Sequence, residues 1–373
     1  MKRTLILGGE GYIGTALQTH LREQGVEVKS VDNLLREVNV ASVDSQSVVD
    51  KVQHDYEHFD ISKDYAKLKK LVEDFKPDTI VHLAEQPSAP FSMMNQENGL
   101  LTIQNNTGGT FNVLRAIKEV DPTIHLIKLG TEGEYPDWLW NGKHIPEGHY
   151  MTVGFMPNEE ELDMGERASE HIQDWKIPVP RAFGSWYHST KFYESHMIEY
   201  AVRIWGLRVT DVNQGVVYGH RNGTRLDVDE AFGTVINRFV AQAVVGIPLT
   251  IYGEGGQTRG FINLQNSLEA ITLLGNNPVE AGEFRVIHQT TQEYSVKEIA
   301  EMVQMFTGCE IQHVDNPRVE MDENKFTFDT STLDNLGLVP VTLKEELPRL
   351  IKVMEENKDR IIKEAILPKT NWR

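Results

Sequence analysis

The chain of 373 residues carries 37 lysines and arginines against 55 aspartates and glutamates, and this formal net charge of −18 argues against a nucleic-acid partner, because phosphate backbones are bound by basic patches. A single cysteine, Cys309, excludes an internal disulfide and a cysteine-cluster metal site, so we expect no metal. The composition is that of an ordinary globular protein without a bilayer-spanning apolar run, and the strand pattern from Thr4 leaves no room for a leader, so we expect a cytoplasmic protein that binds no membrane.

The first predicted elements are a strand, a glycine-rich turn, a helix and a second strand. An apolar run ends at Leu7, helical periodicity runs from Thr15 to Glu23, and VEVKSVD reads as the next strand. Glycines in such a turn let the backbone approach a pyrophosphate at the helix N-terminus, where free N–H groups favour negative charge. We therefore expect the turn to bind NAD through Gly8, Gly11, Tyr12, Ile13 and Gly14.

Asp32 closes the second strand, 18 residues after Gly14. A carboxylate there can accept hydrogen bonds from the adenosine ribose and would repel a 2′-phosphate, which favours NAD over NADP. The remaining predicted cofactor contacts are Asn33, Asp60, Ile61, Leu83, Tyr187 and Lys191.

The middle of the chain continues the alternation of helices and apolar strands. LKKLVEDFKPDTIVHL predicts a helix, a turn and a buried strand, QNNTGGTFNVLRAIKEV a helix, and HLIKLGT a strand that ends at Thr131. This order predicts an α/β protein with a Rossmann-type, doubly wound parallel sheet and its ligand at the carboxyl ends of the strands. Residues 137–181 are polar and broken by prolines, and we expect them to form a loop near the active site.

The length of the chain suits two closely packed domains. We expect residues 1–212 to form the NAD-binding domain, with 257–287 packing back onto it. Residues 213–256 and 288–373 are expected to form a smaller α/β domain that binds the substrate.

Tyr187 precedes Lys191 by four residues in SWYHSTK, a spacing that brings both onto one face of a helix. A nearby ammonium lowers the pKa of a phenol, and such a phenol can take a proton from a sugar hydroxyl while hydride leaves the same carbon. An amphipathic helix with a solvent-seeking lysine would show the same spacing. The upstream pattern G-x-x-G-x-x-G favours catalysis, because both features are typical of short-chain dehydrogenase/reductases.

Eight further stretches narrow the resemblance: HLAEQPSAPFSMM, LGTEGEYP, DVNQGVVYG, FGTVINRF, IYGEGGQTRGFI, GEFRVIHQ, NPRVE and LPKTNWR. Together with SWYHSTK, and in this order along the chain, they resemble the UDP-sulfoquinovose synthases, extended short-chain dehydrogenases that rework nucleotide sugars. Members of that family bind NAD and UDP-glucose, add sulfite and yield UDP-sulfoquinovose. The resemblance therefore implies NAD as cofactor, UDP-glucose and sulfite as substrates, and a homodimer that packs through two helices.

The resemblance also implies the roles of three catalytic residues. Tyr187 would deprotonate the 4-hydroxyl as NAD takes the C4 hydride, Lys191 would lower the pKa of the phenol and hold the nicotinamide ribose, and Thr131 would hydrogen-bond the same oxygen. The 4-keto group acidifies C5, so that water can leave across C5 and C6, sulfite can add to C6, and the hydride can return to C4.

Two further residues are candidates for the proton transfers at C5 and C6. Ordinary 4,6-dehydratases read Thr-Asp-Glu, whereas a glycine holds the second position here, and the shifted acid Glu134 matches the Thr-x-Gly-Glu of the resembled family. Orienting a loop by hydrogen bonds is the alternative role of Glu134. His188 could assist at C6, or it could be a structural histidine on the far side of the helix.

The resemblance places most substrate contacts in the second half of the chain. Arg259 and Arg318 suit a pyrophosphate, because guanidinium forks pair with its oxygens, and Arg238 alternatively braces a loop. Surface ion pairs are the alternative for these side chains. The complete set of predicted substrate contacts is Gln86, Ser88, Asn213, Arg238, Gln257, Arg259, Arg318 and Glu320.

Two positions depart from the resembled family. Pro87 stands where the family has an arginine, and Glu132 where it has an apolar residue, so a cation that could hold sulfite is lost and a repelling carboxylate is added. These changes leave open a related nucleotide-sugar dehydratase or 4-epimerase that does not use sulfite. A non-catalytic Rossmann protein that senses NAD or NADH is the remote alternative, and the joint presence of Thr131, Tyr187 and Lys191 argues against it.

Overall fold

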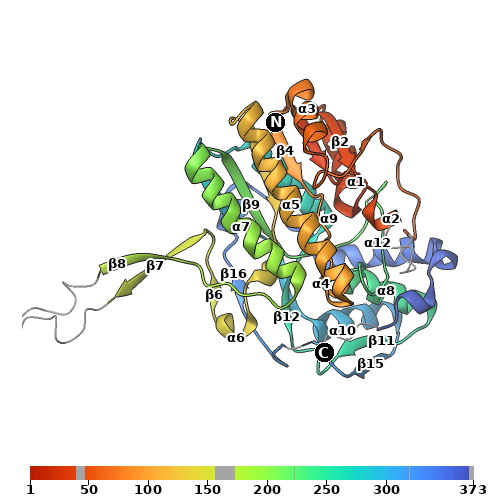
Figure 1. Cartoon of the computed structure of the whole chain (residues 1–373). Coiled ribbons are helices and arrows are strands. Elements are labelled where there is room, and N and C mark those ends of the chain that lie inside the picture. The colour runs from red at the N-terminus through yellow and green to blue at the C-terminus, as the bar shows by residue number, and fades with distance from the viewer. Residues whose placement is uncertain (39–46, 156–172, 222, 319, 369–373) are drawn as a thin grey trace, which may run out of the picture.

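A seven-stranded sheet forms the centre of the molecule, a computed structural model that describes residues 1–38, 47–155, 173–221, 223–318 and 320–368 (Figure 1). Every pair of neighbouring strands is parallel, and Leu7 of the first strand in the sequence lies opposite Val31 on one side and His82 on the other. The strand order is β3 (Glu57–His58), β2 (Glu27–Asp32), β1 (Arg3–Leu7), β4 (Thr79–His82), β5 (His125–Leu129), β9 (Arg208–Gln214) and β13 (Phe284–Gln289).

Helices cover both faces of this sheet, and the alternation of side chains along β1 shows why. Leu5 and Leu7 point into a core shared with α3 (Tyr65–Phe75), α5 (Gln96–Val120) and α7 (Trp186–Trp205). Ile6 points the other way, into a core shared with α1 (Tyr12–Glu23) and α9 (Leu264–Asn276). Successive side chains of a strand face opposite sides, so an all-apolar strand must be covered on both. The predicted Rossmann-type, doubly wound sheet is confirmed.

A separate hydrophobic core lies beyond the sheet. It packs α8 (Val235–Val245), α10 (Val296–Thr307) and α12 (Leu343–Glu356) around the parallel pair β11 (Leu249–Tyr252) and β15 (Ile311–Val314). A three-stranded sheet consists of β10 (Val216–Tyr218), β12 (Thr258–Asn263) and β14 (Gln292–Ser295). It contributes Tyr218 and Phe261 to this core. The smaller elements are α2 (Leu35–Val38), α4 (Ala89–Met93), η1 (Glu132–Glu134), α11 (Ser331–Asn335), η3 (Lys358–Arg360) and η4 (Lys363–Ala365). The proposed division into two domains stays a prediction.

The segment expected to be a loop, residues 137–181, holds regular structure in the part that is described. It contains α6 (Asp137–Trp140) and β6 (His144–Ile145), which pairs with β16 (Thr327–Phe328). An antiparallel ribbon of β7 (Tyr150–Phe155) and β8 (Gln173–Pro178) projects from the body (Figure 1). The expectation of a loop throughout was wrong, because a two-stranded ribbon is held by main-chain hydrogen bonds and tolerates a polar sequence.

None of the helices described has both the length and the apolar character needed to cross a membrane.

Candidate active site

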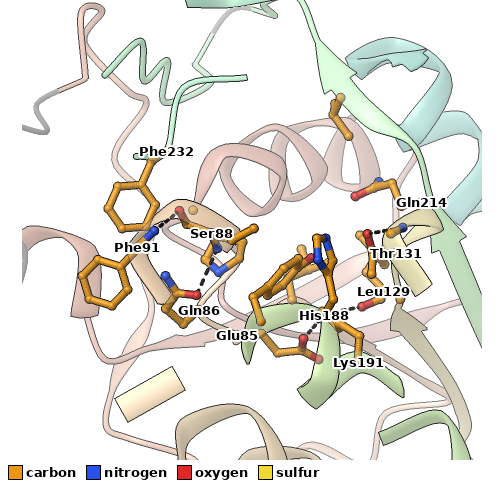
Figure 2. A pocket seen from close by; sticks show the side chains of 18 of the residues that line it. Glu85, Gln86, Ser88, Phe91, Leu129, Thr131, His188, Lys191, Gln214 and Phe232 are labelled. Carbon is orange, nitrogen blue, oxygen red and sulfur yellow. Dashed lines mark hydrogen bonds and ion pairs between the residues drawn. The ribbon is translucent and has the colours of Figure 1, made fainter. Parts of the chain in front are cut away.

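One cavity of about 580 Å³ lies at the carboxyl ends of the sheet strands (Figure 2). Its wall begins at the glycine turn between β1 and α1, continues past Thr131, Tyr187 and Lys191, and reaches Arg259 and Arg318 at the other end. Residues predicted to hold a dinucleotide, to move protons and to bind a pyrophosphate therefore meet in a single space.

Close backbone packing explains the glycines at the cofactor end. Gly8 has a φ of +85°, and a Cβ there would lie 2.6 Å from the carbonyl carbon of Leu83. A Cβ on Gly14 would lie 2.2 Å from the carbonyl oxygen of Gly8. Side chains at these positions would push the turn away from β4 and from the start of α1. The turn therefore keeps the N-terminus of α1 open to an anion, as a pyrophosphate requires.

Asp32 lies in the cavity wall at the end of β2. Its Oδ2 accepts a hydrogen bond from the N–H of Glu10 at 2.9 Å, and its Oδ1 accepts one from the N–H of Leu34 at 2.8 Å. Burial raises the pKa of this carboxyl, and these two hydrogen bonds oppose the shift. These hydrogen bonds fix the orientation of the carboxyl group in the cavity wall.

Eleven of the twelve predicted cofactor contacts line the cavity: Gly8, Gly11, Tyr12, Ile13, Gly14, Asp32, Asn33, Ile61, Leu83, Tyr187 and Lys191. Asp60 does not line it. The Oδ1 of Asp60 instead accepts hydrogen bonds from the N–H and the hydroxyl of Ser62, and so shapes the turn that carries Ile61.

The catalytic helix begins at a serine cap. The hydroxyl of Ser185 accepts a hydrogen bond from the N–H of His188 at 3.2 Å, which starts α7 and places Tyr187 and Lys191 one turn apart. Burial raises the pKa of Tyr187, whereas the charge of Lys128 and a hydrogen bond with the side chain of Thr131 lower it. The structure thus brings Thr131, Tyr187 and Lys191 together as the sequence predicts.

Lys191 has a buried counter-ion that sequence reasoning missed. Its ammonium forms an ion pair with the carboxylate of Glu85 and donates to the carbonyl oxygen of Leu129 at 2.5 Å (Figure 2). Burial lowers the pKa of Lys191 to about 8, and the charge of Glu194 opposes that shift. The signal for Glu85 was its place three residues after a buried strand, where parallel sheets present their functional side chains.

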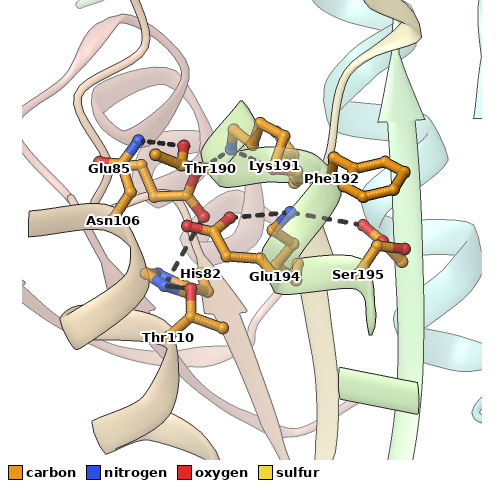
Figure 3. Close-up of polar contacts among 12 residues, drawn as sticks. His82, Glu85, Asn106, Thr110, Thr190, Lys191, Phe192, Glu194 and Ser195 are labelled. Atoms are coloured by element: carbon orange, nitrogen blue, oxygen red, sulfur yellow. Dashed lines mark hydrogen bonds and ion pairs between the residues drawn. The ribbon is translucent and has the colours of Figure 1, made fainter. Parts of the chain in front are cut away.

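A second buried charge cluster lies next to this pair (Figure 3). The ammonium of Lys128 on β5 lies 3.1 Å from a carboxylate oxygen of Glu194 on α7 and 3.8 Å from one of Asp211 on β9, and all three side chains are fully buried. Asn106 of α5 also donates to the hydroxyl of Thr190 at 3.0 Å. These contacts bind α7 to the sheet and to α5. A lysine in the apolar strand HLIKL was the available signal.

Glu132 lines the cavity, whereas Glu134 does not. Glu134 is fully buried behind the cavity wall, where its Oε2 lies 2.8 Å from Nη1 of Arg181. Burial raises its pKa to about 7, against the lowering effect of Arg181. Glu132, which sequence reasoning treated only as an obstacle to sulfite, lies in the wall itself.

His188 also lines the cavity. Its Nδ1 lies 3.1 Å from the hydroxyl of Ser185, and a Cβ on Gly133 would come within 2.3 Å of its Nε2. The ring therefore lies against the loop that follows Thr131. Burial lowers the pKa of His188 to about 3, helped by the charges of Arg318 and Arg259, so the imidazole is neutral near pH 7.

Five predicted substrate contacts line the cavity: Gln86, Ser88, Arg259, Arg318 and Glu320. The carboxylate of Glu320 forms an ion pair with Arg259 and accepts a hydrogen bond from Asn316 at 3.0 Å. Ser88 caps α4 by accepting a hydrogen bond from the N–H of Phe91 at 3.0 Å.

Asn213, Arg238 and Gln257 do not line it. Asn213 donates to the hydroxyl of Tyr135 at 2.7 Å, behind Gly130, while the next residue of β9, Gln214, lies in the cavity wall. Sequence reasoning missed Gln214, although the alternation of side chains along a strand was the signal. Within the described ranges, no cluster of histidine, cysteine, aspartate or glutamate could hold a metal.

The chain is similar to known proteins over its full length. A family model described as the NAD dependent epimerase/dehydratase family matches residues 4–288. The whole chain aligns at 39% identity with 98% of UDP-sulfoquinovose synthase from Sulfolobus acidocaldarius, and at 36% identity with 79% of the chloroplastic UDP-sulfoquinovose synthase of Spinacia oleracea. The fold is similar to that of UDP-glucose 4-epimerase from Thermus thermophilus in complex with NAD, with a TM-score of 0.67 and 21% identity over 94% of this chain and 98% of that one.

Proposed function

The chain belongs to the NAD dependent epimerase/dehydratase family, and from that premise we propose that it converts UDP-glucose and sulfite to UDP-sulfoquinovose. One observation carries the proposal: the glycine turn with Asp32, the Tyr187–Lys191 pair and the arginines 259 and 318 line the same cavity. Similarity to UDP-sulfoquinovose synthases along the whole chain supports the choice of substrates within the family.

The cofactor is NAD. When bound, NAD supplies the acceptor for the C4 hydride and returns that hydride at the end of the cycle. The glycine turn and Asp32 would hold its pyrophosphate and adenosine ribose, because the cavity is lined by the N-terminus of α1, which has no side-chain cap, and by the fixed carboxyl group of Asp32.

Tyr187 would take the proton of the sugar 4-hydroxyl. The phenolate that this requires is favoured by the charge of Lys128 and by the hydrogen bond with Thr131, although burial opposes it. Lys191 would add a positive charge on the same helix face, its ammonium being 5.6 Å from the centre of the Tyr187 ring. Lys128, Lys191 and Thr131 would thus together favour the phenolate that the proton transfer needs.

The later steps need proton transfer at C5 and C6. A 4-keto group acidifies the proton on C5, and His188 in the cavity wall is a candidate base because its imidazole is neutral, although the burial and the arginine charges that lower its pKa oppose the transfer. Glu134 remains a candidate for the same steps, but its ion pair with Arg181 behind the wall supports the alternative role of orienting the loop. Arg259 and Arg318 would bind the pyrophosphate of the sugar nucleotide, and Glu320 would accept hydrogen bonds from the uridine ribose.

We also infer a homodimer that packs through α5 and α7, which lie side by side on the sheet (Figure 1). Both helices expose large apolar side chains at helical spacing, a pattern that marks a surface meant to be covered. These side chains are Leu100, Ile103 and Phe111 on α5, and Trp186, Tyr193, Tyr200 and Ile204 on α7. Light scattering of the wild type should give twice the mass of one chain, and Ile103→Glu should give a monomer.

Mass spectrometry of UDP-glucose incubated with the NAD-loaded enzyme tests the proposed reaction. With sulfite, the product should have the mass of UDP-sulfoquinovose, and its appearance should require both substrates. A product that has lost water whether or not sulfite is present would identify a dehydratase, and UDP-galactose of unchanged mass would identify a 4-epimerase.

A further inference from the structure

Glu132 lies in the cavity wall, where a glycine of β12 makes room for its carboxyl group. It opens the short helix η1 directly after the cap residue Thr131, and only 7% of Glu132 is exposed. Its Oε2 accepts a hydrogen bond from the N–H of Gly260 at 2.8 Å. A Cβ on Gly260 would lie 2.3 Å from that oxygen and 2.7 Å from the hydroxyl of Thr290, so β12 accommodates the carboxyl group only because residue 260 is a glycine.

The other oxygen of Glu132 is unused by the protein. Among the described residues, Oε1 has no hydrogen-bond partner and no exposed surface of its own, although Glu132 lines the cavity. A buried oxygen without a partner is costly unless a ligand satisfies it, and the cost is larger for a carboxylate than for a neutral carboxyl group. The arrangement therefore favours a protonated Glu132, whose second oxygen is left for a ligand in the cavity to satisfy.

The charged and titratable groups that act on Glu132 come from three neighbouring elements. Arg259 on β12 and Glu293 on β14 act in opposite directions, and the neutral ring of His188 on α7 packs against Gly133. Burial outweighs the guanidinium of Arg259 and the hydrogen bond from Gly260, and it raises the pKa of Glu132 to about 8. Glu132 is therefore mainly neutral near pH 7 until it gives up its proton.

We propose that Glu132 is a catalytic acid that protonates the C6 hydroxyl group as it leaves the sugar. The proposal rests on the proposed function and assigns one of its steps. A base takes the proton from C5, the electrons of that bond form the C5–C6 double bond, and the C6–O bond breaks. The oxygen keeps the bonding pair, takes the proton of Glu132 and departs as water, which leaves a carboxylate.

The acid is restored when bisulfite adds. The sulfur lone pair forms the bond to C6, and the proton of bisulfite passes to the Glu132 carboxylate. The π electrons of the double bond move to C5, which regains a proton from the base. Bisulfite enters and water leaves, so no further reactant is needed and the hydride remains available for C4.

Two substitutions separate the acid from its alternatives. Glu132→Gln keeps the shape and a hydrogen-bond donor but cannot transfer a proton, and Glu132→Met removes both. In single turnovers with UDP-glucose and no sulfite, both variants should still show the NADH absorbance of C4 oxidation. Loss of water should slow by roughly 10²–10⁴-fold, the usual contribution of a general acid. Glu293→Gln is the matched control, because Glu293 is a neighbouring acid outside the cavity wall whose charge has the smallest of the four effects on the pKa of Glu132, so elimination should stay close to the wild-type rate.

Retained C5 hydrogen exchange into deuterated solvent should accompany the slow elimination in Glu132→Gln, because the base remains. Water loss within a factor of about three of wild type in Glu132→Gln would overturn the proposal. Loss of C4 oxidation together with elimination would overturn it too, since the residue would then be structural.

A measurement without substrate keeps this test distinct from that of the proposed function. Infrared spectra of the wild type at pH 6.5 should contain a protonated-carboxyl C=O band that Glu132→Gln lacks and Glu293→Gln retains. If that band is absent, Glu132 is not an acid in any reaction, and the inference fails. If the band is present and UDP-glucose gives no sulfonated product, the proposed function alone fails.

Discussion

The ammonium of Lys191 on α7 forms an ion pair with the carboxylate of Glu85, which follows β4 across the cavity wall. The side chains are only 5% and 3% exposed, and Lys191 also donates to the carbonyl oxygen of Leu129. Glu85 therefore fixes the position of the ammonium that would act on Tyr187. A buried pair of this kind leaves an uncompensated charge when one member is removed.

The pair should show strong coupling in a double-mutant cycle. Glu85→Gln and Lys191→Met should each lower the free energy of unfolding by about 3–5 kcal/mol, because each leaves its partner charge buried. The double variant should lose much less than the sum. Urea unfolding followed by circular dichroism measures all four proteins. The exposed pair Lys70–Asp74 is the matched control and should show almost no coupling.

Additive losses for Glu85 and Lys191 would mean that the two side chains do not depend on one another. The ion pair would then not be what positions Lys191.

Tyr187→Phe should bind NAD and UDP-glucose normally and lose turnover by roughly 10²–10⁴-fold, the usual worth of a general base. Stopped-flow absorbance should show no rapid NADH formation, because the 4-hydroxyl keeps its proton. Tyr193→Phe changes an exposed tyrosine on the same helix and serves as the control. Near-normal turnover of Tyr187→Phe would place the base elsewhere.

Asp32 should make NAD bind far more tightly than NADP. Its carboxylate is held by the N–H groups of Glu10 and Leu34, so it cannot turn away from a 2′-phosphate. Calorimetric titration of the wild type and of Asp32→Ser measures the ratio of the two affinities, which should fall in the variant. A wild type that prefers NADP would contradict the role given to Asp32.

The sheet and its helices were predictable because their signals are local. The apolar run of β1, the helical periodicity of α1 and the glycines between them predict a strand, a turn and a helix from neighbouring residues alone. The joint position of Tyr187 and Lys191 was predictable for the same reason, since one helix turn defines it, whereas the place of Thr131 beside them was implied by the family resemblance.

The direction in which individual side chains point was less predictable than the strands and helices themselves. Glu132 and Glu134 belong to a single 3₁₀ turn, and sequence alone does not say which carboxyl group faces the cavity. Gly260, whose lack of a side chain makes room for the carboxyl group of Glu132, lies on a strand 128 residues further along the chain. Asn213 and Gln214 are adjacent on β9 and point to opposite sides of the strand. An error of one residue in a predicted register would therefore exchange the buried side chain and the side chain that lines the cavity.

Glu134→Gln separates a catalytic role from a structural one. If Glu134 moves a proton at C5 or C6, the variant should still oxidise C4, and NADH and a 4-keto sugar should accumulate on the enzyme. If its ion pair with Arg181 only orients the loop, both half-reactions should fall together or neither should change. Single-turnover NADH absorbance, paired with deuterium exchange at C5, distinguishes these outcomes. Exchange at the wild-type rate in Glu134→Gln would remove Glu134 from C5 chemistry.

The pH dependence of stability tests the protonation state of Glu132 without any substrate. Burial raises the pKa of Glu132 from its ordinary value of 4.5 to about 8, so between these pH values the folded protein binds a proton that the unfolded chain has lost. The stability contributed by this group is present below about pH 4.5 and is lost as pH rises towards 8. At about 1.4 kcal/mol for each pH unit, the loss between pH 5 and pH 8 is at most about 4 kcal/mol.

Glu132→Gln has no proton to lose at this position, so its stability relative to the wild type should rise between pH 5 and pH 8. Urea unfolding at both pH values gives the difference, in which the other titrating groups cancel. In Glu293→Gln, where the Glu132 carboxyl group is intact, stability should fall with pH as it does in the wild type. A difference between wild type and Glu132→Gln that stays constant from pH 5 to pH 8 would mean that the carboxyl group is already ionised at pH 5. Glu132 would then face the sugar as a charge and could not serve as its acid.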